Sequence, residues 1–107
     1  EEEIIYIDNY RCHCACGDNK LSSLDVSNNT QLEILSCKNN ILTALDLSKN
    51  TQLTGLDCRS NNLNAIDVSK NTLLSTLSCD NNQLTAIDVT KNTQLTGLDC
   101  KTCWICC

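Results

Sequence analysis

The sequence predicts a thin, layered β-rich solenoid of short parallel strands with little or no α-helix. Two observations lead to this fold class. The chain repeats itself every 21 residues, which is the signature of stacked repeats. Aromatic residues make up 3% of its 107 residues, and Phe, Met and Pro are absent, so the core must be filled by Leu, Ile, Val and Cys. The length suits one domain rather than two.

Five cysteines, each 21 residues from the next, set the register of the repeat: Cys16, Cys37, Cys58, Cys79 and Cys100. Aligning the chain on them gives coils that start at residues 11, 32, 53, 74 and 95, the last of which stops part-way. We therefore expect an N-terminal capping strand over residues 1–10, a solenoid over 11–105 and a Cys tail at 106–107. In this alignment Ile105 takes the core place of Leu84, and Trp104 takes the place of Gln83.

The residue pattern predicts a capping strand and then two extended pieces in each coil. The apolar stretch within residues 1–10 predicts a short strand that covers the open edge of the first coil. In each coil a Leu-x-Cys piece alternates with period two and predicts a strand, and the Asn-rich stretch after it predicts a turn. A second extended piece, such as residues 66–69, leads to a polar corner. A single coil cannot bury its apolar side chains alone, so the coils must stack and pair their strands in parallel.

The pattern L-x-x-L-x-C-x-x-N-x-L resembles the leucine-rich repeat family over residues 11–105. The sequence of the repeats is similar to the short 21-residue repeats of Bacteroidetes-type bacterial proteins. The resemblance implies a right-handed coil that offers a recognition surface, and it points to a secreted or cell-surface protein. It says little about the function itself, because this fold mostly supplies surfaces for recognition.

Two buried columns follow from the register. An asparagine lies three residues after each of the first four ladder cysteines, where the coil turns inward, so its amide must find partners in the adjacent coil: Asn19, Asn40, Asn61 and Asn82. The cysteine column is interpreted as stacked thiols, because in-register strands hold side chains parallel, about 4.8 Å apart, whereas a disulfide needs a specific crossed pair. A linear track for zinc or copper(I) is the alternative.

An acidic column lies on the second extended piece, at Asp25, Asp46, Asp67 and Asp88. Calcium is one interpretation of it. The preferred interpretation is that each carboxylate bonds the backbone of its own corner, because one carboxylate per position falls short of the six to eight oxygens that calcium takes.

The outward positions of the strands vary while their inward neighbours do not. Such variation suits a binding surface, although drift on a solvated face would give the same pattern. The predicted binding surface consists of Ile34, Ser36, Lys38, Asp57, Arg59, Ser78, Asp80, Asp99 and Lys101.

Further chemistry-bearing residues gather at the two ends, at Cys12, His13, Cys103, Cys106 and Cys107. The interpretations are a metal site for zinc or copper(I), a capping disulfide that joins Cys103 to Cys106 or Cys107, or free thiols. Four coil steps of about 4.8 Å separate the ends by roughly 19 Å, so one ion cannot bridge them within a monomer, although a head-to-tail dimer could complete a site.

The sequence thus predicts a non-catalytic recognition or scaffold module that binds a protein or peptide through its strand face, as a monomer or weak head-to-tail dimer. The alternative is a cytoplasmic precursor or carrier whose tail, TCWICC, is modified by an enzyme or binds a soft metal, with the repeats acting as the leader. No cofactor is expected. The net charge of −5 disfavours nucleic acid, and no apolar run suits membrane insertion.

Overall fold

The computed structural model describes residues 5–7, 12–101 and 104–106, with side chains over residues 15–101. Eight strands lie within these ranges and no helix does: β1 (Ile5–Ile7), β2 (Cys12–Ala15), β3 (Ile34–Ser36), β4 (Gly55–Asp57), β5 (Thr76–Ser78), β6 (Ala86–Asp88), β7 (Gly97–Asp99) and β8 (Trp104–Cys106). Accordingly, the described residues contain no helix that could cross a membrane.

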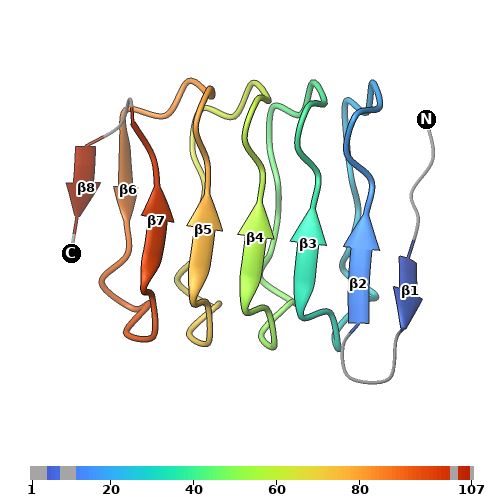
Figure 1. Cartoon of the computed structure of the whole chain (residues 1–107), viewed down its shortest axis with the longest axis horizontal. Helices are drawn as coiled ribbons and strands as arrows, with labels where there is room; N and C mark the ends of the chain where they lie inside the picture. The colour runs from blue at the N-terminus through green and yellow to red at the C-terminus, as the bar shows by residue number, and fades with distance from the viewer. Residues whose placement is uncertain (1–4, 8–11, 102–103, 107) are drawn as a thin grey trace.

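Six of the strands form one sheet, in the order β1-β2-β3-β4-β5-β7 (Figure 1). From β2 to β7 every pairing is parallel, and each strand pairs with the residues one repeat later, so that Leu35 faces Leu56 and Leu56 faces Leu77. At the N-terminal edge, β1 pairs antiparallel with β2. The stacked coils measure 34 × 29 × 19 Å along the principal axes.

β3, β4, β5 and β7 are each three residues long and centred on a leucine, which is buried in β3, β4 and β5 and half-buried in β7. In β4 Leu56 is 3% exposed, while Gly55 and Asp57 are half-buried. The backbone pairing continues one residue further, because Cys58 N donates to Ser78 O over 2.9 Å. The predicted Leu-x-Cys strand therefore begins one residue earlier than expected, and the cysteine sits just beyond its end.

The second extended pieces form the rear of the coils. Among the described residues the rear pieces of the fourth and last coils are strands: β6 and β8, which pair parallel. In the inner coils single backbone bonds join the rear pieces near their starts, as where Asn62 N donates to Leu42 O over 2.8 Å.

The register predicted for the last coil is wrong. Ile105 lies opposite Ile87 and Trp104 opposite Ala86, whereas the period of 21 placed Ile105 opposite Leu84. The last coil is thus three residues shorter between its cysteine and its rear strand than the inner coils. The chain after Cys100 reads KTCW and lacks the Asn-rich stretch that makes the inner corners long.

The core fills the space between the sheet and the rear pieces. It consists of leucine, isoleucine, valine and cysteine side chains contributed by every described coil, most of them less than 5% exposed. At each inner corner the chain enters the left-handed region two residues after the ladder cysteine, with φ between 57° and 61° at Asp18, Asn39, Ser60 and Asn81. Asn and Asp tolerate this conformation better than other residues with side chains.

Ser60 is the serine among these corner residues, which makes it a test of corner strain. We expect Ser60→Asn to raise the free energy of unfolding by up to about 1 kcal/mol, and Ser60→Val to lower it by about 1–2 kcal/mol, because a β-branched residue fits φ > 0 poorly. Urea denaturation of both variants measures the difference. Equal stabilities would contradict the assigned corner geometry.

Candidate functional site

The first asparagine ladder joins each coil to the one before it. Asn61 donates from Nδ2 to Cys37 O of the previous coil and to Cys58 O of its own coil, both over 3.0 Å. Its Oδ1 accepts from Leu42 N over 3.1 Å. Asn40 and Asn82 make the same set of bonds one coil earlier and one coil later. Each amide therefore satisfies backbone groups that the inward turn would leave unpaired.

The ladder weakens toward both ends of the stack. Asn40 and Asn61 are each 6% exposed, whereas Asn19 and Asn82 are half-buried. Asn19 donates to Cys16 O and Gly17 O within its own coil. The expectation of burial thus holds for the two inner members and is wrong for the outer two, because fewer coils cover them.

A second asparagine ladder, which the sequence reasoning missed, lies at the opposite corner. Asn50, Asn71 and Asn92 are at most 4% exposed, and each donates from Nδ2 to two backbone oxygens of the previous coil. Their Oδ1 atoms are buried and accept no hydrogen bond from the described residues. The signal was visible, because every polar corner carries an asparagine in this place, beginning with Asn29.

The two ladders should contribute unequally to stability. We expect Asn61→Ala to lower the free energy of unfolding by at least about 2 kcal/mol, because it leaves a buried donor and buried acceptors unpaired. Asn71→Ala should lower the free energy of unfolding by less. It also removes an unpaired buried oxygen, and Asn50 O and Leu47 O still accept hydrogen bonds from backbone N–H groups. Urea denaturation compares the two, and an equal or larger loss for Asn71→Ala would refute this ranking.

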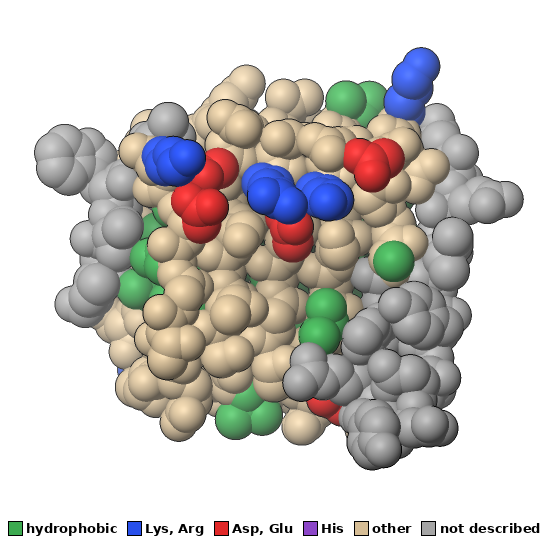
Figure 2. All heavy atoms as spheres, viewed as in Figure 1, with side chains coloured by type: hydrophobic (Ala, Val, Ile, Leu, Met, Phe, Trp, Pro, Cys, Tyr) green, Lys and Arg blue, Asp and Glu red, His purple; other side chains and the backbone are tan. Residues whose placement is uncertain are grey.

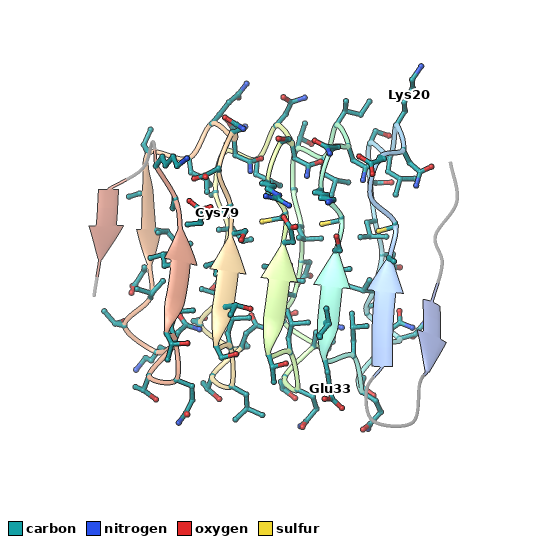
Figure 3. All side chains as sticks on the ribbon, viewed as in Figure 1. Lys20, Glu33 and Cys79 are labelled. Carbon is teal, nitrogen blue, oxygen red and sulfur yellow. The ribbon has the colours of Figure 1, made fainter. Side chains whose placement is uncertain are left out.

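The cysteine column lies beside the carboxyl ends of the front strands. Cys16, Cys37, Cys58 and Cys79 are thiols outside any disulfide, each at most 1% exposed. Figure 3 shows sulfur atoms at a similar height in successive coils, with Cys79 labelled. Burial raises the pKa of Cys37 to about 12 and that of Cys79 to about 11, and it raises the pKa of Cys58 well above the ordinary value. The thiols act as small apolar side chains and are poor nucleophiles.

The expectation that all five ladder cysteines remain thiols is wrong at Cys100, which is disulfide-bonded. Its partner is none of the other four, since these are outside any disulfide. Cys100 is half-buried because it lies in the last coil, whereas the inner sulfurs are sealed by coils on both sides. A disulfide therefore forms at the accessible end of the column and the sealed thiols stay reduced.

The raised thiol pKa values make stability depend on alkaline pH. In the unfolded chain these thiols lose their protons near pH 9, while in the folded chain they keep them up to about pH 11–12. Their contribution is complete below pH 9 and falls as the pH rises toward 12. We expect the urea midpoint to drop over this window, and to drop less steeply in a Cys37→Ala, Cys58→Ala variant. Parallel pH profiles would contradict the assignment.

The acidic column lies exposed on the rear piece. The carboxylates of Asp25, Asp46, Asp67 and Asp88 each accept from the backbone N–H two residues later. The pKa of Asp67 is lowered first by the Ser69 side chain and then by the Ser69 N–H, and Lys70 adds a smaller effect. Each carboxylate bonds its own corner, and the described residues contain no group of three or more His, Cys, Asp or Glu that could hold a metal.

The strand face carries its charges in one band beyond the carboxyl ends of the strands, above a mostly uncharged region (Figure 2). Arg59 Nε lies 3.2 Å from Asp57 Oδ1. Lys101 N donates to Asp80 Oδ1 over 2.6 Å and lowers the pKa of Asp80, while the hydrogen bond with Asp80 raises the pKa of Asp99. The structure thus places Asp57 with Arg59, and Asp80 with Asp99 and Lys101.

The other predicted surface residues flank a shallow hollow of about 280 Å³ across β3, β4 and β5. Ile34, Ser36 and Ser78 line it, and all three are half-buried. Lys38 is half-buried and lies against Gly17 of the preceding coil, where a side chain on Gly17 would meet Lys38 Cγ at 3.1 Å. The predicted surface is therefore a continuous strip over neighbouring strands.

Several predicted residues fall outside this description. Cys103 and Cys107 lie outside the described residues, as do the side chains of Cys12, His13 and Cys106. The metal, modification and Cys103 disulfide hypotheses therefore stay predictions. The backbone of His13 lies between Tyr6 and Ile34 in the front sheet, and Cys106 lies opposite Asp88 in the rear sheet.

Comparison with solved structures reveals a similar stack. The chain matches the functional domain of InlJ from Listeria monocytogenes, a domain described as including a cysteine ladder, with a TM-score of 0.67 and 37% identity over 81% of this chain. The chain has the fold of a leucine-rich repeat solenoid. This likeness and the parallel sheet of short strands confirm the predicted fold class and support the leucine-rich repeat family.

The match covers a small part of the InlJ chain, because this chain spans 24% of its length. No protein-family model matches the sequence. No curated protein matches it either. The finer likeness to Bacteroidetes-type repeats stays a prediction, because the matching structure comes from Listeria.

Proposed function

We propose that this solenoid is a non-catalytic recognition module that binds a protein or peptide through its strand face. The observation that carries the proposal is the contrast between the two sides of each front strand. The inward position is leucine in β3, β4, β5 and β7, while the positions on either side of it are Ile and Ser in β3, Gly and Asp in β4 and β7, and Thr and Ser in β5.

The residues that stabilise the stack are different from the residues that would contact a partner. The inward leucines and the two asparagine ladders supply the packing and the polar bonds that hold the coils. The outward side chains can therefore change without disturbing the stack. A surface that combines a charged band, hydroxyl groups and a hollow on a rigid scaffold suits recognition of a polypeptide.

The chemistry of the described residues also favours binding over catalysis. The inner thiols are sealed and hold their protons, so they are poor nucleophiles. The carboxylates of the acidic column are exposed, and each bonds its own corner. A binding module requires neither a nucleophile nor a general base.

Selection of peptides from a random display library against the purified chain tests this function. We expect binders whose affinity falls at least tenfold in the variant Lys38→Ala, Asp57→Ala, Arg59→Ala. The matched control is Asp67→Ala, Lys70→Ala, Lys91→Ala, which removes the same charges from exposed rear positions and should leave affinity unchanged. Equal losses in both variants, or no binders, would overturn the proposal.

A further inference from the structure

We propose that the hollow at Gly55 is a subsite for one Lys or Arg side chain of an extended peptide partner. The proposal rests on the proposed function and names the chemistry that the strand face selects. Its elements are a gap in a row of side chains, the aliphatic side chain of Ile34 on one side of the gap, the hydroxyl of Thr76 on the other, and a carboxylate at its end.

The gap arises because Gly55 carries no side chain where its neighbours do. A Cβ built on Gly55 would lie 3.3 Å from Thr76 Oγ1 and 3.7 Å from Ile34 Cγ1. Ile34 and Thr76 are the residues that pair with Gly55 in β3 and β5. A narrow slot therefore lies between two side chains that stand one coil on either side, within the hollow of about 280 Å³.

The slot ends at a carboxylate. Asp57 lies two residues after Gly55 on the same strand, so its side chain is on the same face, and it lines the same hollow. Its side chain is 26% exposed. Arg59 Nε and Arg59 N both contact Oδ1, at 3.2 Å and 3.4 Å. Among the described residues the hydrogen bonds of this carboxylate go to Oδ1, which leaves Oδ2 for a donor that enters along the slot.

A long cationic side chain fits these surroundings better than the alternatives. Its methylene stem would lie against Ile34 and Thr76, and its charged head would reach Asp57, as Lys and Arg commonly divide their contacts. An apolar side chain would desolvate Asp57 without a compensating bond. An acidic side chain would meet Asp57 and a chain of net charge −5, which also favours a basic partner at long range.

The chain offers a matched control at Gly97, the equivalent position two coils later. A Cβ on Gly97 would lie 3.5 Å from Thr76 Cγ2, which is ordinary van der Waals contact. Gly97→Ala thus adds a side chain to the same column of the strand face and leaves the slot at Gly55 unfilled.

NMR titration of the ¹⁵N-labelled chain tests the subsite. The probes are three synthetic heptapeptides of sequence Ser-Thr-Gly-X-Gly-Thr-Ser with X as Arg, norleucine or Glu. We expect the Arg peptide to shift the amide signals of Gly55, Asp57 and Thr76, and to bind at least fivefold more tightly than the other two. Gly55→Val and Asp57→Asn should each weaken the Arg peptide at least threefold, whereas Gly97→Ala should not. Gly55→Ala replaces Gly55→Val if the larger side chain disturbs the spectrum elsewhere.

Equal binding of the three peptides, shifts elsewhere on the chain, or unchanged binding to the Gly55 and Asp57 variants would overturn the subsite. These outcomes leave the proposed function standing if the selected display peptides still depend on the strand face. The proposed function itself would fail by a different result: the display selection would yield no peptide whose binding depends on the strand face.

Discussion

Two asparagine amides per coil, both buried in the inner coils, are the constraint on which the rest of the structure depends. At the corner after the ladder cysteine, Asn61 donates to Cys37 O and accepts from Leu42 N, backbone groups that would otherwise be unpaired in an apolar interior. At the opposite corner Asn71 donates to Leu47 O and Asn50 O of the preceding coil, which also accept from backbone N–H groups. Such bonds form only if neighbouring coils have the same length and shape. The asparagine bonds therefore depend on the 21-residue period, and a coil of another length would lose them.

The same constraint limits what the interior can hold. The described core is filled by Leu, Ile, Val and Cys side chains, and Cys58 is sealed there without exposure. Variation is then confined to positions that point away from the stack. The strand face can differ from coil to coil because Leu56 and Leu77 hold the backbone beneath it in register.

Much of the fold could be predicted from the sequence, because in a repeat protein the residue type at each structural position is seen once in every coil. The places of Asn40 and Asn61 follow from the spacing alone, since any column that recurs at one period must occupy one place in every coil. Asn50 and its equivalents recur just as strictly, yet a polar corner rich in Asn and Thr also reads as an ordinary exposed turn. The coil that contains Cys100 escaped prediction because its sequence departs from the repeat: KTCW replaces the Asn-rich stretch, Ile105 shifts its register, and Cys100 is disulfide-bonded.

The interchangeability of the coils is the central claim, and paired deletions test it most directly. Removing residues 53–73 takes out one whole coil and joins Gln52 to Leu74, which is the same junction type that the chain already uses at Gln31 and Leu32. Cooperative unfolding in urea, with a lower midpoint than the parent chain, is the result expected for this variant. Removal of residues 53–72, one residue fewer, leaves one extra residue at the junction and should lower the midpoint further, because the spacing between the coils on either side of that corner is then 22 residues instead of 21. Similar unfolding curves for the two deletions would contradict the account.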